Sequence, residues 1–262
     1  MNVQIELLQI VAAAAARLNI DIMLIGAFAR DYWSSYYNLT GCMRTTFDID
    51  FSCQVAAWDE FQKLFDLLIS DFDLKRDPKK THSLWLRDDI SLDLVPCGNI
   101  ADGNGTIAWP PEYRTTLCVL GYDVAKQDSV LVPFGNCKIK VIKPYWLALL
   151  KLQSFIGNPF EREKDLQDLF FLVCNYCDCI DQDRRLFAKD GIDHDLLAMD
   201  SFDYKLVGAE LIRRDCQRFN QQITDQICAS VRKFDYEELV KALCIASHTD
   251  SGTAEKIIDA FI

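Results

Sequence analysis

The sequence predicts an α+β protein, with a mixed sheet flanked by helices in its first half and only helices in its second. Two observations predict this class. Short apolar or alternating runs, typical of strands, occur only before Lys143-Pro144. After that point, apolar residues recur at helical spacing. We therefore expect two domains, residues 1–142 with the sheet and residues 143–262 with helices alone.

Helices and strands alternate at the start of the chain. A short apolar run stops at Gly26, and a helical pattern follows it directly. The segment TFDIDFSC alternates apolar and acidic residues, which is the period of a strand. The predicted elements are helices over 2–18, 27–37 and 55–70, and strands over 22–25 and 46–53.

A hairpin is predicted next, with Asp88-Asp89 as the turn between strands 83–87 and 90–95. Residues 97–113 are rich in Gly, Pro and Asn and are predicted to form a loop. The remaining predicted strands are 115–120, 129–132 and 137–142. The predicted helices of the second half are 145–155, 162–177, 204–219, 221–232, 236–247 and 253–261.

The composition is that of an ordinary globular protein, with 50% hydrophobic and 26% charged residues in 262. No stretch approaches the ~20 apolar residues that a membrane span needs. The eleven cysteines are odd in number and many lie in apolar runs, which indicates reduced thiols in the cytoplasm. A zinc site at Cys174, Cys177 and Cys179 is the alternative, but no second ligand pair follows at the usual spacing.

The net charge of −11 is opposite to that of most proteins that clamp a nucleic-acid backbone. A local basic patch would still allow an RNA substrate. Cationic residues on the C-terminal helices would form either such a strip or a solvated helix face. They are Arg213, Arg214, Arg218, Arg232 and Lys233.

Three acids are the candidate metal ligands. In a strand, Asp48 and Asp50 point to one face, with apolar neighbours on the other. Asp93 lies in an otherwise apolar strand, where burying it without a partner is costly. Close carboxylates repel unless a cation neutralises them, and hard oxygen ligands suit Mg²⁺ (or Mn²⁺). The alternative is a solvent-exposed strand edge whose acidic residues bind no metal.

Gly26 adds a candidate phosphate site, because a glycine at a strand-to-helix junction lets backbone amides approach a phosphate. Carboxylates on neighbouring strands and a phosphate cradle are what two-metal phosphoryl transfer requires. Other chemistries fit poorly. The chain has three histidines, none in a nucleophile context, and no Walker-type loop.

This pattern resembles the polymerase-β nucleotidyltransferase superfamily, which has a glycine-led turn after a strand, an acidic pair and a later third acid. IGAFARD followed by TFDIDFS is similar to the corresponding region of CCA-adding enzymes and poly(A) polymerases. The best resemblance is to the AbiEii-like group of abortive-infection and toxin–antitoxin systems, and it extends to LLKLQSF and REKDLQDL. It covers about residues 22–172 and implies a nucleotidyltransferase-type sheet.

The resemblance also implies roles for single residues. Asp48, Asp50 and Asp93 would hold the metals. Lys151 would be catalytic and meet the phosphates. The implied nucleotide-binding residues are Gly26, Ala27, Arg30, Arg44, Arg162, Asp165 and Asp168. Ala27 departs from the usual Gly or Ser, and the long gap before Asp48 predicts an inserted loop over residues 38–44.

Alternatives remain for several of these residues. Arg44 would bind phosphate or pair with an acid of the site. Arg30 is expected to pair with Asp31 and brace the site rather than to meet a ligand. Asp165 and Asp168 lie on one helix face, where a surface ion-pair ladder is the alternative to nucleotide binding.

The predicted function is transfer of a nucleoside monophosphate from an NTP to a hydroxyl acceptor, with Asp93 as general base. The acceptor would be an RNA or tRNA end, a small molecule or a protein, and the toxin resemblance implies an antitoxin partner. The alternative is a non-catalytic module that senses nucleotide or a partner. No membrane partner is expected.

Overall fold

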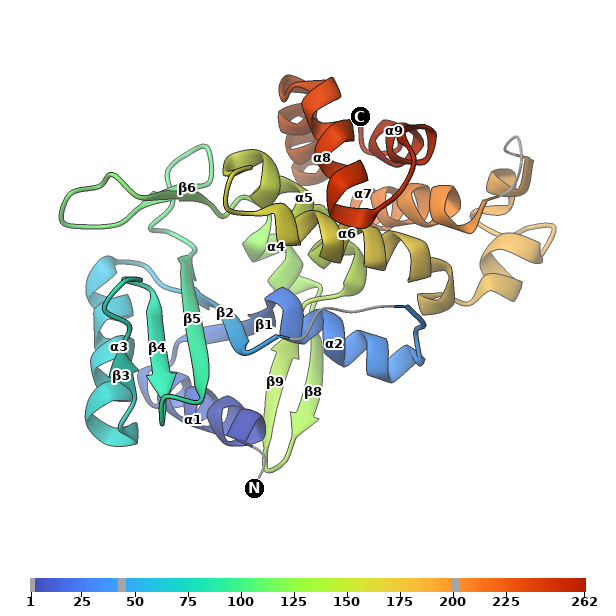
Figure 1. The fold of residues 1–262 in the computed structure, drawn as a ribbon. Coiled ribbons are helices and arrows are strands. Elements are labelled where there is room, and N and C mark those ends of the chain that lie inside the picture. Colours follow the sequence, from blue (N-terminus) through green and yellow to red (C-terminus); the bar gives the residue numbers. More distant parts are fainter. Residues whose placement is uncertain (1–2, 42–45, 199–202) are drawn as a thin grey trace. The chain divides into compact units, whose positions relative to one another are not determined.

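The computed structural model describes residues 3–41, 46–198 and 203–262, and it confirms the α+β class (Figure 1). Contacts divide the chain into two units. Residues 1–31 and 44–143 form one, here called the sheet unit, and residues 32–43 and 144–262 form the other, the helical unit. Within the described residues, no helix is both long enough and apolar enough to cross a bilayer.

The sheet unit contains a seven-stranded mixed sheet in the order β3-β4-β5-β2-β1-β9-β8. β2 is parallel to β5 and β1 is parallel to β9, whereas the other neighbouring pairs are antiparallel. The strands are β1 (Asp21–Ile25), β2 (Asp48–Gln54), β3 (Lys75–Arg76), β4 (Ser83–Leu86), β5 (Ile90–Cys97), β8 (Val130–Phe134) and β9 (Cys137–Val141).

Two long helices cover this sheet. α1 (Val3–Leu18) packs against α3 (Trp58–Phe72) and also contacts β1, β5 and β9. In β2, Ile49 and Phe51 are fully buried, while Asp48 and Asp50, which alternate with them, keep partial exposure. The core therefore fixes which way the acidic side chains point. The predicted alternation is confirmed from Asp48 to Phe51. It fails outside them, because Phe47 lies before the strand and is 71% exposed, and Ser52 and Cys53 are both buried.

The predicted hairpin is present, but its turn includes Arg87 as well as the predicted Asp88-Asp89. β4 and β5 pair antiparallel from Leu86↔Ile90 onward, and residues 87–89 make the turn. Arg87 and Asp88 adopt φ of 54° and 59°, the left-handed conformation that tight hairpin turns use.

The segment 97–113 differs from the predicted loop. It contains β6 (Thr106–Ala108), which pairs with β7 (Thr116–Cys118) in a small separate sheet. β7 is shorter than the predicted strand 115–120, and α4 (Tyr122–Gln127) was not predicted. A small core of Cys97, Ile107, Trp109 and Val119 holds this region together. Elements of three to six residues carry too few apolar positions to show a period in sequence.

The helical unit is built from α5 (Pro144–Gly157), α6 (Glu163–Asn175), α7 (Tyr204–Lys233), α8 (Tyr236–Ser247) and α9 (Ser251–Asp259). Two 3₁₀ turns, Tyr176–Cys179 and His194–Ala198, and one π turn, Asp183–Phe187, connect α6 to α7. α5 is almost entirely buried and packs against α6 and α7. The break predicted between helices 204–219 and 221–232 is confirmed, because Asn220 in α7 has a non-helical φ of −151° and ψ of 93°.

Candidate active site

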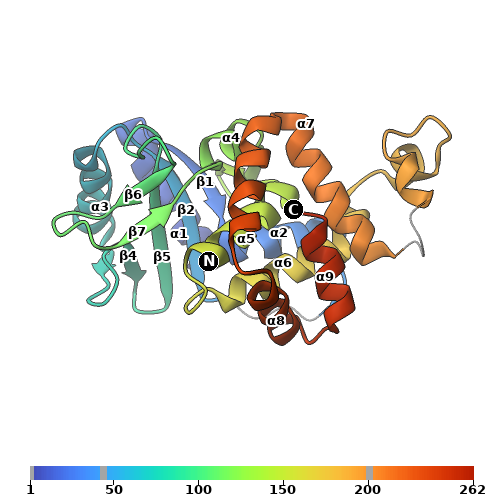
Figure 2. The same cartoon turned by 90° about the horizontal axis from the view of Figure 1, so that it is seen from above.

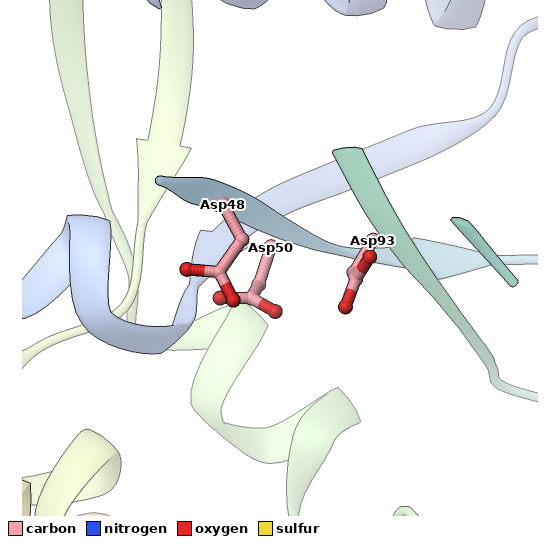
Figure 3. Close-up of side chains that lie close together, drawn as sticks. All are labelled: Asp48, Asp50 and Asp93. Atoms are coloured by element: carbon pink, nitrogen blue, oxygen red, sulfur yellow. The ribbon is translucent and has the colours of Figure 1, made fainter. Parts of the chain in front are cut away.

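The three predicted acids meet at one place in the sheet unit. β2 and β5 are parallel neighbours, and their register sets Asp50 directly beside Asp93. One carboxylate oxygen from each of Asp48, Asp50 and Asp93 lies within 4.8 Å of the other two. Figure 3 shows the three side chains projecting to the same side of their strands. Among the described residues no other acids, histidines or cysteines form such a group, and Cys174, Cys177 and Cys179 do not.

The carboxylate of Asp93 is held in one orientation. Its Oδ1 accepts hydrogen bonds from the hydroxyls of Ser83 at 2.6 Å and Ser91 at 3.3 Å. Its Oδ2 lies 3.7 Å from Lys80 Nζ and 4.0 Å from His82 Nε2. Asp93 is only 8% exposed, so these partners offset the cost of burying its charge.

Ser83, Lys80 and His82 were not predicted as site residues. The predicted two-residue turn at Asp88-Asp89 would set position 83 opposite position 94, whereas the three-residue turn of the structure sets Ser83 opposite Asp93. Lys80 and His82 precede β4 in a segment without periodicity, so sequence offered no reason to place them near Asp93.

Gly26 ends β1 and begins α2 (Gly26–Tyr37) with φ of +69°. Ile25, the residue before Gly26 and the last of β1, pairs with Asp50 of β2. A Cβ at Gly26 would lie 1.9 Å from Asp50 Oδ2 and 2.5 Å from its Cγ. The glycine is therefore required both by its backbone conformation and by the carboxylate packed against it. Ala27, the next residue, is 1% exposed.

Arg30 on α2 is 2% exposed, and its Nε donates to Asp31 Oδ1 at 2.8 Å. The pair expected to brace the first turns of α2 is thus present. A phosphate contact by Gly26, Ala27 or Arg30 stays a prediction. Arg44, the other candidate phosphate ligand, lies outside the described residues.

Lys151 belongs to a buried ion cluster of the helical unit. Its Nζ lies 2.6 Å from Asp165 Oδ1 and 2.8 Å from Asp168 Oδ2, which joins α5 to α6. Asp165 and Asp168 are 4% and 0% exposed, so the surface ion-pair ladder considered for them is wrong. Arg162, which is exposed, lies 3.8 Å from Asp165. Burial alone would lower the pKa of Lys151, but the two carboxylates outweigh it, so its pKa is raised and the amine stays charged. The nucleotide contacts implied for these residues stay predictions.

The arginines considered for a basic strip are largely paired with acids. Arg214 and Arg218 both bind Asp193, which is fully buried, and Arg213 binds Glu210. Arg232 donates to the carbonyl of Ile262. Asp193 also binds Arg185 of the π turn, so this network ties the turns before α7 to α7 itself. Arg213, Arg214 and Arg218 are therefore held in ion pairs, whereas Arg232 and Lys233 are exposed.

The acidic triad fits a divalent cation. Two carboxylates 4.8 Å apart repel by about 3 kcal/mol at an effective dielectric constant of about 20, and three of them form three such pairs. All three donors are hard oxygens, the ligand type that Mg²⁺ and Mn²⁺ prefer. The fixed orientation of Asp93 leaves its Oδ2 on the side of Lys80 and His82, away from the serine hydroxyls.

Comparison with known proteins finds no family model and no curated protein that matches the chain. Several solved structures resemble it in part. The antibiotic-resistance factor ANT(2'')-Ia has 11% identity and a TM-score of 0.42, with 84% of this chain and 97% of that chain covered. An antigenic nucleotidyltransferase-like protein from Paracoccidioides brasiliensis has 14% identity and a TM-score of 0.38, over 85% and 91%. A tRNA-processing enzyme has 13% identity and a TM-score of 0.23, over 94% and 79%. Similarities at this level do not assign the chain to a family.

Proposed function

We propose that this protein is a metal-dependent nucleotidyltransferase that moves a nucleoside monophosphate from an NTP to a hydroxyl acceptor. The observation that supports this best is the meeting of three carboxylates from two parallel neighbouring strands, beside a glycine that begins a helix. Three mutually repelling acids are costly for a protein that only binds a partner. They suit phosphoryl transfer, where bound cations offset both their charge and that of the phosphates.

In the proposed reaction the acceptor's oxygen forms a bond to the α-phosphorus, and the bond from that phosphorus to the β-phosphate bridging oxygen breaks. Pyrophosphate leaves, and Asp93 takes the proton of the acceptor hydroxyl. Asp48, Asp50 and Asp93 would hold Mg²⁺ or Mn²⁺, which supplies charge neutralisation when bound. Backbone amides in the first turn of α2 would orient the triphosphate, helped by the positive end of the helix dipole.

Finer features of the proposal come from the resemblance to AbiEii-like proteins. It favours an RNA or tRNA end as acceptor and an antitoxin partner. The change of sequence pattern at Lys143-Pro144 favours a catalytic domain over residues 1–142 and a helical domain over 143–262. The resemblance also favours nucleotide contacts by Lys151, Arg162, Asp165 and Asp168. A small molecule or a protein is the other class of acceptor.

The test is incubation with labelled NTPs and Mg²⁺, with total RNA in one series and free hydroxyl compounds in another. We expect label transfer that chelation abolishes and that Asp48→Ala lowers at least about 100-fold, the scale for loss of one electrostatic group at a reacting centre. The control is Asp89→Ala in the exposed hairpin turn, which should keep full transfer. Nucleotide binding without transfer to any acceptor would contradict the enzyme and indicate a sensor.

A further inference from the structure

An aromatic groove lies in the sheet unit beside the small β6–β7 sheet. Trp58 at the first turn of α3 packs against the core that contains Trp109, a residue just after β6. Figure 2 shows β6 and β7 beside α3. Together with Phe61 and Phe65 these rings line a groove of about 330 Å³. That volume is at the lower end of the range for small-ligand sites. The groove can therefore take a single ring system and little more.

Two tryptophans line the groove and pack against each other. Their ring centroids are 5.6 Å apart with tilted planes, which leaves no room for a ligand ring between them, but Trp58 remains partly exposed and can stack on a base. Trp109 is 8% exposed, and its buried Nε1–H has no hydrogen-bond acceptor among the described residues. A buried indole N–H normally has an acceptor, and leaving one unpaired costs about 1–3 kcal/mol. This unpaired donor belongs to a residue that lines the groove.

The groove is connected to the acid triad through one side chain. The ring of His82 lies 5.7 Å from the ring of Trp109, and its Nε2 lies 4.0 Å from Asp93 Oδ2. Thr81, the preceding residue, lines the groove. His82 therefore lies near both Trp109 of the groove and Asp93, the acid proposed to accept the acceptor's proton.

The rim of the groove is polar but has little net charge. Arg76 lies over the ring of Phe65 at 5.3 Å and pairs with Asp66, while Gln62 offers an amide. A planar ring with hydrogen-bonding edges fits such a site better than a highly charged ligand does. Stacking needs no net positive charge, which suits a protein with a net charge of −11.

We propose that this groove binds the nucleobase of the acceptor, so that the hydroxyl to be modified belongs to a nucleoside or to the terminal nucleotide of an RNA. The inference rests on the proposed function for the role of that hydroxyl, but base binding can be measured without any transfer. Trp58 is the main stacking residue, and His82 positions the acceptor between the groove and Asp93.

Equilibrium binding of adenosine, cytidine, guanosine and uridine is measured in EDTA by calorimetry. Nucleosides lack phosphates, so the triad and its metals do not contribute. We expect Trp58→Ala to weaken binding by about 5- to 150-fold, the range for loss of one stacked base, and Trp58→Phe to weaken it less. Tyr113→Ala removes an exposed aromatic residue close to Trp109 in sequence and should leave binding unchanged. Gln62→Trp, at an exposed position on the rim, should block the groove without touching its core.

The outcomes separate the two proposals. If nucleoside binding depends on Trp58 but no label is transferred to any acceptor, the base-binding proposal is supported and the proposed enzymatic function is contradicted. If label is transferred and Trp58→Ala leaves the KM for the acceptor unchanged, the base-binding proposal is contradicted and the proposed enzymatic function is supported. Affinity for free nucleosides identifies a small acceptor, whereas binding of a short RNA with a free 3′ end, again dependent on Trp58, identifies an RNA end. If neither free nucleosides nor the short RNA bind, or if Gln62→Trp binds them as tightly as the wild-type protein does, the inference is wrong.

Discussion

Gly26→Ala is expected to displace the carboxylate of Asp50, although Gly26 is not itself one of the three acids. The added methyl group would lie 1.9 Å from Asp50 Oδ2, whereas real Cβ contacts are essentially never under 3.0 Å. The carboxylate must therefore retreat by roughly 1 Å, a displacement that can cost about 100-fold in rate at a reacting centre. The expected result is a nucleotidyl transfer rate about 100-fold lower, although no acid has been replaced.

The loss of stability should be smaller. A φ of +69° costs an alanine about 1–2 kcal/mol relative to glycine, and a strained Asp50 rotamer adds about 0.5–1.5 kcal/mol. Alanine also makes the unfolded chain less flexible, which returns about 0.4–1 kcal/mol. The free energy of unfolding should therefore fall by about 1–3 kcal/mol, which a stable domain tolerates.

The matched control is Gly135→Ala, at a similar φ of +62° in the β8–β9 turn. Its methyl group would meet the amide end of Gln9, a flexible group that can move aside. Thermal and urea unfolding give the stability of both variants, and label transfer with Mg²⁺ gives their activity. Gly135→Ala should lose stability and keep its activity. If the two variants lost activity equally, or if Gly26→Ala transferred label at a near wild-type rate, the argument that Gly26 positions Asp50 would be wrong.

Three further predictions concern the helical unit. Lys151→Met leaves the two buried carboxylates of Asp165 and Asp168 without their cation. Urea titrations should therefore show that the free energy of unfolding falls by about 3–5 kcal/mol. A loss under about 1 kcal/mol would show that this ion cluster does not stabilise the fold. Burial alone would raise the pKa of Asp193, but hydrogen bonds from arginines lower it, so its contribution to stability is present above about pH 4 and is lost as the pH falls further. Arg185→Gln should therefore move the acid-unfolding midpoint to higher pH, whereas Asp195→Asn, at an exposed position, should move it little. Asn220 accepts a hydrogen bond from a backbone amide of the next turn, so Asn220→Ala should cost about 1 kcal/mol while Asn220→Asp should not, as circular dichroism melts would show.

Much of the candidate site follows from local pattern. The alternation in TFDIDFS puts Asp48 and Asp50 on one face, because neighbouring side chains of a strand point to opposite faces whatever surrounds it. The existence of the β4–β5 hairpin is local in the same way, because turn residues and alternating strands lie a few positions apart. Its register is not predicted from sequence alone, since the observed turn of residues 87–89 is one residue longer than predicted and shifts Ser83 to the position opposite Asp93.

Other features depend on segments far apart in the chain. Nothing local makes β5 the parallel neighbour of β2, yet that pairing places Asp93 beside Asp50. The contact of Gly26 with Asp50, and the arginines around Asp193, also arise only when distant elements pack. Their register is decided by burial summed over the whole core, which no short stretch of sequence contains.

The amino-acid sequence by itself determined the longer helices and strands, the break at Asn220 and the chemistry of the three acids. Only the tertiary structure decided that those acids converge, that Asp165 and Asp168 are buried around Lys151, and that His82 lies near both Trp109 and Asp93. The physical reason is the distance along the chain over which each kind of interaction acts. Backbone periodicity acts over a few residues, whereas the partners of a buried charge come from whichever elements the core brings together.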